Sequence, residues 1–276
     1  MSRWFKILRM GRFLVFLAVT IGIFHKTLAG ISNPHVLRDP ERCVNEYLTS
    51  IKDYPYLVVI RSGDFPVCSG VIVSETQILT SNQCTTKWPI EPLTVKIGCS
   101  NPLEGGTIIK VTKVTSHGEN YVSENGYTAA LAILTLNSSI LEDSFAKIAD
   151  LNKQTEFIPE GTGALLVGWG SSPGVSSSFG YLGELKMQFV PNSECTDIYN
   201  STMPLAMPED LICASASIPL CQGDVGGPLI VGKRVVGILS WGDCFKPGYP
   251  QVFANISANI GWIEEERRNL NRNLIE

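Results

Sequence analysis

The stretch Pro-Leu-Cys-Gln-Gly-Asp-Val-Gly-Gly-Pro-Leu at residues 219–229 decides how the chain is interpreted. On its own, Gly-Asp-Val-Gly-Gly is consistent with a tight turn, because glycine and aspartate are common turn residues. The isopropyl side chain of Val225, at the centre of this stretch, has no lone pair and cannot act as a nucleophile. One loop does not establish a fold, so the prediction depends on whether the rest of the sequence agrees with it.

The N-terminus has the order of segments found in secretory signal peptides. Basic residues up to Arg12 precede a twelve-residue apolar run at 13–24, and small residues near Ala29 suit cleavage. A membrane anchor needs about twenty apolar residues, so this run is too short to span a bilayer. We therefore predict a signal peptide at 1–29, a short propeptide-like segment at 30–42, a folded domain at 43–276, and secretion without a membrane span.

The predicted mature chain is acidic. The sequence has 22 basic and 26 acidic side chains, and its first 29 residues hold five of the basic ones and no acidic one. Cleavage therefore leaves 22 − 5 = 17 basic against 26 acidic residues, a net charge of −9. Because such a surface repels polyanions, we expect neither nucleic acid nor heparin to be the main ligand.

All eight cysteines lie beyond residue 29. An even number in a secreted chain predicts disulfides, although this pattern alone does not fix the pairing. No Cys-x-x-Cys pair indicates a metal site or redox chemistry, and no cofactor is predicted. Asn-x-Ser/Thr acceptor sites predict N-glycosylation at Asn137, Asn200 and Asn255.

Short runs rich in β-branched and aromatic residues follow one another from Tyr54 onward, separated by Gly, Pro, Asn and Ser. This spacing predicts an all-β sandwich or barrel. The expected strands are 56–60, 68–73, 93–97, 107–114, 131–136, 164–167, 184–190, 228–231, 234–240 and 251–256. Only 262–272 predicts a helix, in which Glu264 is placed to pair with Arg268.

The 219–229 stretch resembles the nucleophile loop of the chymotrypsin/trypsin serine protease family, Cys-Gln-Gly-Asp-Ser-Gly-Gly-Pro-Leu. Residues 68–84 are similar to the family's first disulfide loop, which ends Leu-Thr-Ala-Ala-His-Cys, and 130–136 are similar to its Asp-Ile-Ala-Leu-Leu-x-Leu. Further similar motifs follow in the family's order at 166–170, 192–195, 211–213, 240–244, 250–253 and 262–263. The resemblance implies two packed antiparallel six-stranded β-barrels with a cleft between them, a seam near 150–162 and a C-terminal helix.

All three catalytic positions of the family are replaced in this chain. The resemblance places Gln83 where the family has its histidine base, Ala130 at the orienting aspartate and Val225 at the serine nucleophile. An amide is not basic near neutral pH, and alanine cannot orient a base. His35 lies upstream of the domain and His117 in an expected surface loop, so we predict no substitute base and no enzyme activity.

The loop at 219–229 retains some features of the family's nucleophile loop. The resemblance assigns oxyanion stabilisation to the backbone N–H groups of Gly223 and Val225, which need no side chain. It also makes Asp224 the partner of the ammonium group that activation cleavage frees. That cleavage site falls on Arg42–Glu46, where Cys43 replaces the family's leading isoleucine.

The resemblance also predicts a blocked specificity pocket. Pro219 stands at the pocket base, Gly242 forms one wall, and Gln251 replaces the bare glycine of the opposite wall. We expect the long Gln251 side chain to fill the cavity, because alternate residues of that strand face the core. The alternative is that Gln251 turns out to solvent.

The resemblance implies three disulfides, Cys68–Cys84, Cys195–Cys213 and Cys221–Cys244. A further family bridge is absent on both sides, where Ala164 and Val231 stand instead. The remaining cysteines are Cys43 and Cys99, which we hypothesise to bond to each other. In the alternative, one of them bonds to a partner chain.

These observations predict a secreted, inactive serine protease homologue that acts by binding protein. The resemblance suggests proteases or their regulators as partners, with a role as cofactor, decoy or regulator in an extracellular cascade. One alternative is an active serine endopeptidase with a non-standard site. Another is a structural secreted glycoprotein.

Overall fold

The computed structural model describes residues 48–86, 93–117, 131–140, 145–153, 158–170, 180–199, 210–216, 224–241 and 249–273. All of these residues belong to one compact unit, Asp39–Glu276. No helix within them is long and apolar enough to cross a membrane.

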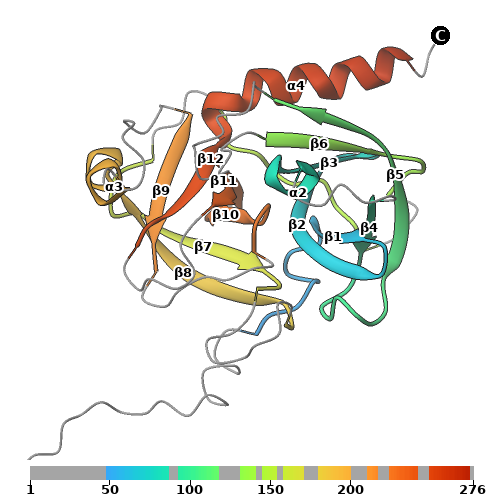
Figure 1. The fold of residues 1–276 in the computed structure, drawn as a ribbon, viewed down its shortest axis with the longest axis horizontal. Helices are drawn as coiled ribbons and strands as arrows, with labels where there is room; N and C mark the ends of the chain where they lie inside the picture. Colours follow the sequence, from blue (N-terminus) through green and yellow to red (C-terminus); the bar gives the residue numbers. More distant parts are fainter. Residues whose placement is uncertain are drawn as a thin grey trace, which may run out of the picture. The chain divides into compact units, whose positions relative to one another are not determined.

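Six antiparallel strands close the first barrel in the order β1-β2-β3-β6-β5-β4 (Figure 1). Their bounds are β1 Leu57–Ser62, β2 Phe65–Ser74, β3 Gln77–Ser81, β4 Leu93–Ile97, β5 Thr107–Ser116 and β6 Leu131–Leu136. The short helix α2, Gln83–Thr86, follows β3 directly.

Six further strands close the second barrel in the order β10-β11-β12-β9-β8-β7. Their bounds are β7 Gly163–Gly168, β8 Gly183–Val190, β9 Leu211–Ser215, β10 Pro228–Val231, β11 Arg234–Trp241 and β12 Gln251–Asn255. Helix α3 spans Asn192–Tyr199, and the C-terminal helix α4 spans Ile256–Asn273. The predicted pair of barrels with a C-terminal helix is confirmed, and the predicted seam at 150–162 lies between the last strand of one barrel and the first of the other.

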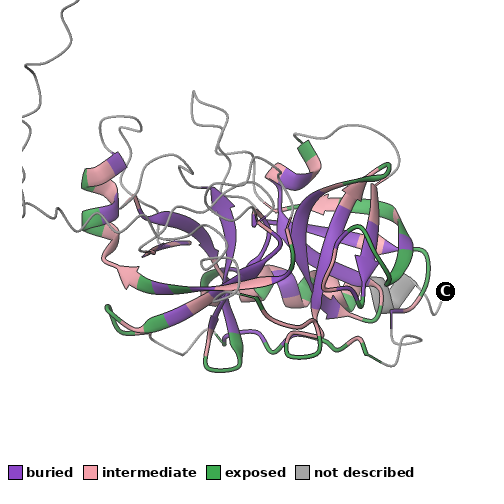
Figure 2. Ribbon diagram, turned by 90° about the horizontal axis from the view of Figure 1, so that it is seen from below, coloured by how far each residue is buried: buried purple, intermediate pink, exposed green. Residues whose placement is uncertain are grey.

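The side chains sort into an interior and an exterior set by alternation along each strand. Val58, Ile60 and Val95 face the interior of the first barrel, and Leu166, Met187 and Phe253 that of the second. Outward-facing apolar residues of both barrels form a third set that packs the barrels together. Figure 2 shows buried residues, in purple, along the strands of both barrels. This inter-barrel cluster includes Leu57, Val59, Val71, Leu79, Ile133, Val167, Trp169, Ile230, Ile238 and Ile263.

Ser100 joins three segments that are far apart in the sequence. Its carbonyl oxygen accepts hydrogen bonds from Nε1 of Trp169 at 3.0 Å and from the N–H of Leu182 at 2.9 Å. Its hydroxyl accepts a bond from the N–H of Ile51 at 3.0 Å. The loop after β4 therefore holds the entering chain and the second barrel against the first.

Several elements differ from the sequence prediction. The strands β3 and β9 and the helices α2 and α3 were not expected, and α4 begins at Ile256 instead of 262. Asn255 explains this earlier start, because its Oδ1 accepts the Ser257 N–H at 3.1 Å and so caps the helix. The predicted partner of Glu264 was wrong, since Glu264 pairs with Arg267 at 2.8 Å and not with Arg268.

Two of the implied disulfides are present, Cys68–Cys84 and Cys195–Cys213. Both Cys221 and Cys244 lie outside the described residues. At the place of the absent bridge, Ala164 is buried and Val231 packs against the same apolar cluster, so apolar contacts fill the space.

The hypothesised bond between Cys43 and Cys99 is not formed in this structure. Cys99 is a free thiol, and it is buried in the inter-barrel cluster. Burial raises the pKa of this thiol, and the nearby cations Lys96 and Arg61 partly offset that rise. The Cys99 thiol is thus packed among apolar side chains. Its hypothesised partner, Cys43, lies outside the described residues.

Candidate functional site

The candidate site is centred on a tight turn at residues 224–227. The N–H of Gly227 donates to the carbonyl of Asp224 at 2.7 Å, which closes the turn around Val225 and Gly226. Gly226 has a φ of 82°, which a type II turn requires at its third residue. The sequence Asp-Val-Gly-Gly thus presents Val225 at the tip of a constrained turn.

Hydrogen bonds fix this turn between the two barrels. The carbonyl oxygen of Val225 accepts a hydrogen bond from the N–H of Ser69 in β2 at 2.9 Å. The N–H of Gly226 donates to the carbonyl oxygen of Leu239 in β11 at 2.8 Å. The Sγ of Cys84 lies 3.7 Å from the same Val225 oxygen, although a disulfide sulfur has no proton to donate. The isopropyl group of Val225 packs against the interior cluster of the first barrel.

Asp224 is the buried carboxylate of the turn. Its Oδ1 accepts the N–H of Gly170 at 2.9 Å, and its side chain occupies the space where Gly168 and Gly170 lack a Cβ. The two glycines of Leu-Val-Gly-Trp-Gly therefore make room for this carboxylate. The motif was recognised in the sequence, but this reason for its glycines became visible only in the structure.

The short helix α2 brings Gln83, the predicted base position, close to this turn. Gln83 begins α2 next to Cys84, whose sulfur contacts the carbonyl of Val225. Ala130 lies outside the described residues, but Leu131 after it pairs with Ser81 across β3 and β6. The described residues thus agree with the assignment of Gln83 and Val225 to one site.

A buried polar group beside Gln83 was missed by sequence reasoning. Asn82 is buried, and its Oδ1 accepts hydrogen bonds from the hydroxyls of Ser116 at 2.7 Å and Thr85 at 3.0 Å. These bonds tie the end of β5 to the start of α2. The available signal was an asparagine where the resembled motif has alanine.

The N–H of Val225 is one of the two donors that the resemblance predicts for an oxyanion. Among the described residues, no acceptor contacts the N–H of Val225. An N–H group without an acceptor at this place can donate to a carbonyl or carboxylate oxygen of a bound chain. The second predicted donor, Gly223, lies outside the described residues.

One wall of the predicted specificity pocket, at Gln251, lies among the described residues. Gln251 is 4% exposed, so the alternative in which it turns out to solvent is wrong. Its Nε2 lies 3.3 Å from the carbonyl oxygen of Tyr249, to which it donates. Pro219 and Gly242 lie outside the described residues, so blockage of the whole pocket stays a prediction.

His117 does not lie in an exposed loop, as the sequence had suggested. It directly follows β5, is half-buried, and stacks on Trp262 of α4 with ring centroids 4.4 Å apart. Burial lowers the pKa of His117 below 6.5, and the carboxylate of Asp210 opposes this shift. The imidazole thus serves to pack α4 against the first barrel.

This lowered pKa predicts an acid-sensitive contact. The unfolded chain protonates His117 at a higher pH than the folded chain does, so stability should fall as pH decreases through 6.5. A His117→Phe variant keeps an aromatic ring on Trp262 but does not titrate. Thermal unfolding between about pH 8 and 5 should show a smaller loss of Tm in this variant than in the unmodified chain. An equal loss in both proteins would contradict the assignment.

The predicted glycosylation sites have different surroundings. Asn137 is exposed after β6, whereas the side chain of Asn255 caps α4. Asn200 lies outside the described residues. Glycosylation itself stays a prediction at all three positions.

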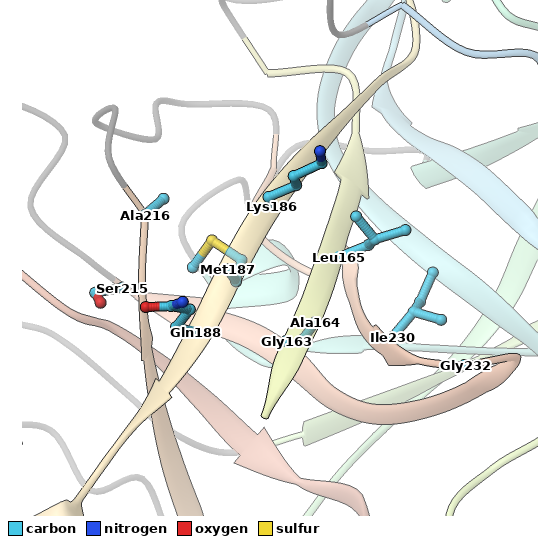
Figure 3. A pocket seen from close by; sticks show the side chains of 10 residues that line it. All are labelled: Gly163, Ala164, Leu165, Lys186, Met187, Gln188, Ser215, Ala216, Ile230 and Gly232. Carbon is cyan, nitrogen blue, oxygen red and sulfur yellow. The ribbon is translucent and has the colours of Figure 1, made fainter. Parts of the chain in front are cut away.

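A groove of about 710 Å³ lies on the second barrel, over β7, β8 and β10 (Figure 3). Its lining residues come from β7 (Gly163, Ala164, Leu165), β8 (Lys186, Met187, Gln188), the end of β9 (Ser215, Ala216) and the β10 hairpin (Ile230, Gly232). Its lining includes no residue of the 224–227 turn, so the groove is separate from the candidate site.

Comparisons with known proteins agree with this geometry. The family described as Trypsin matches residues 44–263, which is most of the chain. The chain belongs to the trypsin family. Hypodermin-B of Hypoderma lineatum is 32% identical over 234 residues, covering 82% of this chain and 88% of its own. Trypsin 5G1 of Aedes aegypti is 30% identical over 237 residues, covering 84% and 87%.

A solved structure shares the fold. Neuropsin, a serine protease expressed in the limbic system of mouse brain, superposes with a TM-score of 0.70 at 23% identity. The match covers 80% of this chain and 99% of the neuropsin chain. At this identity, the likeness supports the trypsin-like arrangement of two barrels and no finer conclusion.

Proposed function

We propose that this protein is a secreted trypsin-family member without peptidase activity, which acts by binding another protein. The observation that carries the proposal is Val225 at the tip of the 224–227 turn. A valine side chain can neither attack a carbonyl carbon nor accept a proton, so the first step of acyl transfer has no nucleophile.

The surroundings of the turn support the same proposal. Gln83 stands at the base position, and an amide takes up no proton near neutral pH. His117, the one histidine among the described residues, is stacked on Trp262 and is thus committed to packing. Gln251 is buried along a wall that the resembled family leaves open to substrate.

The retained scaffold favours binding over a purely structural role. The turn keeps its constrained glycine, Gly226, and the Val225 N–H has no acceptor among the described residues, which supports a role in binding a partner's oxygen atom. Such a surface suits a cofactor, decoy or regulator that holds a protease, or a regulator of proteases, without cleaving it. Relatives that are named trypsins support a protease, or a regulator of proteases, as the class of partner.

We expect the purified chain to hydrolyse no peptide or ester substrate and to escape labelling by fluorophosphonates. A Val225→Ser variant should also stay inactive, because no base activates the new hydroxyl. Labelling is read on a gel against active trypsin as the positive control. Labelling of the unmodified chain that survives removal of contaminating proteases would overturn the proposal and favour an enzyme with a non-standard site.

The binding half of the proposal has its own test. A second protein should copurify with the mature chain from its native fluid and be identified by mass spectrometry. Recovery of an abundant chain without any stoichiometric partner would instead favour a structural glycoprotein.

A further inference from the structure

The groove on the second barrel opens where this chain departs from its family. The pairing of β7 with β10 ends at Leu165 with Ile230, and both residues line the groove. The next pair along the ladder would be Ala164 with Val231, the two positions at which the family's further bridge is absent. The groove therefore lies at the end of a strand pair that this chain does not tie with a disulfide.

Two glycines leave space in this groove. Gly163 of β7 and Gly232 after β10 line it, and a Cβ built at either position meets no atom within 4 Å. The φ of Gly163 lies outside the left-handed region, so the backbone does not require glycine there. What Gly163 provides is open space beside Leu165.

Apolar side chains make up much of the remaining lining. Leu165 and Ile230 pack in the inter-barrel cluster, whereas Ala164 and Met187 belong to the interior cluster of the second barrel. The volume of about 710 Å³ is within the range of pockets that hold small organic ligands. An apolar ligand in this groove would be stabilised by removal of its surface from water.

Lys186 is the one ionisable residue of the lining. It is exposed, and it pairs with Leu165 across β8 and β7, where Figure 3 shows the two side chains on neighbouring strands. Among the described residues, no carboxylate forms an ion pair with Lys186. Glu184, on the same face of β8, hydrogen-bonds instead to Tyr54, and burial together with this carboxylate raises the pKa of the Tyr54 hydroxyl. The Lys186 ammonium is thus available to a ligand in the groove.

We propose that this groove binds a small amphiphile of the medium-chain fatty acid class. Its apolar chain lies over Gly163 against Leu165 and Ile230, and its single carboxylate pairs with the Lys186 ammonium. A polyanion fits poorly, because the lining offers one cation among apolar side chains, and a wholly apolar ligand would leave that cation without a partner. The site is independent of the proposed protein-binding role, because its lining includes no residue of the 224–227 turn.

Direct binding is measured with dansyl-undecanoate and the full mature chain, from the rise in dansyl fluorescence. Dodecanoate should displace the probe from one site per chain, and octanoate should displace it about tenfold or more weakly, because it buries fewer methylene groups. Raising salt from about 50 to 500 mM should change the affinity by less than about threefold, because one ion pair contributes little of it.

Filling the groove tests its location. Gly163→Leu should weaken dodecanoate binding about tenfold or more, because the new side chain occupies the space of the apolar chain. The matched control is Gly261→Leu in α4, where an added Cβ also meets no atom within 4 Å. Binding by this control should stay within about twofold of the unmodified chain, because the site is distant.

Removing the cation tests the carboxylate contact. Lys186→Met keeps an apolar stem and loses the charge, so it should weaken dodecanoate binding about two- to fivefold and leave binding of methyl dodecanoate unchanged. Lys113→Met, the same change at an exposed position of the first barrel, should leave both within about twofold. Equal weakening of the acid and the ester by Lys186→Met would contradict the proposed ion pair.

Several outcomes would overturn the proposal. They are equal weakening by the two leucine variants, displacement of the probe by a heparin oligosaccharide in preference to dodecanoate, and absence of probe binding. Uptake of several probe molecules per chain, with the same affinity in every variant, would mean adventitious adsorption of a surfactant.

Photo-crosslinking of the unmodified chain locates the ligand even if Gly163→Leu does not fold. A fatty acid that carries a diazirine should label peptides that contain residues 163–165, 186–188 or 230–232, which line or adjoin the groove. An excess of unlabelled dodecanoate should suppress this labelling. Labelling confined to other peptides would refute the assignment of the ligand to this groove.

Discussion

Replacing Trp169 with alanine should lower the free energy of unfolding by about 3–5 kcal/mol. Trp169 is completely buried and lies in the inter-barrel cluster with Val59 of the first barrel and Ile238 of the second. Removing the indole leaves a cavity between two rigid barrels, which can collapse only partly to fill it. The loss is mainly one of packing, because the Ser100 carbonyl still accepts the Leu182 N–H when the indole donor is gone.

A Trp169→Phe variant separates packing from the hydrogen bond. Phenylalanine keeps most of the buried area but cannot donate to the Ser100 carbonyl, which lies 3.0 Å from Nε1. Its expected cost is about 1–2 kcal/mol. Urea unfolding followed by fluorescence and circular dichroism measures both variants. A cost below about 1 kcal/mol for Trp169→Ala would show that the barrels do not depend on this contact.

Strands with continuous apolar runs could be predicted from the sequence, and polar buried strands could not. The expected bounds of β4, β6 and β10 match the structure, because their side chains follow the hydrophobic pattern of half-buried or buried strands. Strand β3 was missed because it contains Gln77, Thr80 and Ser81, which are all buried. Long-range bonds satisfy two of them, since Thr80 donates to the Ser69 carbonyl and Gln77 to that of Glu266.

The short helices were missed for a different physical reason. Helix α3 has eight residues, a length at which intrinsic propensity alone does not hold a helix. The disulfide from Cys195 to Cys213 and burial of Tyr199 fix it against β9 instead. Such tertiary causes do not appear in the local sequence pattern.

The sequence motif was enough to locate the candidate site, whereas its shape is explained by contacts that only the structure shows. The resemblance alone placed Gln83 and Val225 in one site, and the Cys84 contact with the Val225 carbonyl agrees with that placement. It could not reveal that Gly168 and Gly170 shape a space for the Asp224 side chain.

A Gly226→Ala variant should be destabilised by about 2–5 kcal/mol, from two independent causes. The φ of 82° costs an alanine about 1–2 kcal/mol, because its Cβ crowds the backbone in the left-handed region. In addition, a Cβ at this position would overlap the carbonyl oxygen of Ser69 and the hydroxyl of Thr80, which is hydrogen-bonded to that oxygen. Overpacking against fixed backbone adds about 1–3 kcal/mol. The turn that carries Val225 should therefore be lost or displaced.

Gly232 provides the matched control, because it shares the backbone strain without the overlap. Its φ is 63°, and a Cβ placed there meets no atom within 4 Å. Gly232→Ala should therefore cost about 1–2 kcal/mol, the strain alone. The difference between the two variants, measured by urea unfolding, isolates the close approach of β2 to the turn. Equal losses of unfolding free energy in the two variants would mean that the turn can move away from Ser69. The hydrogen bond from the Ser69 N–H to the Val225 carbonyl would then not fix the turn against β2.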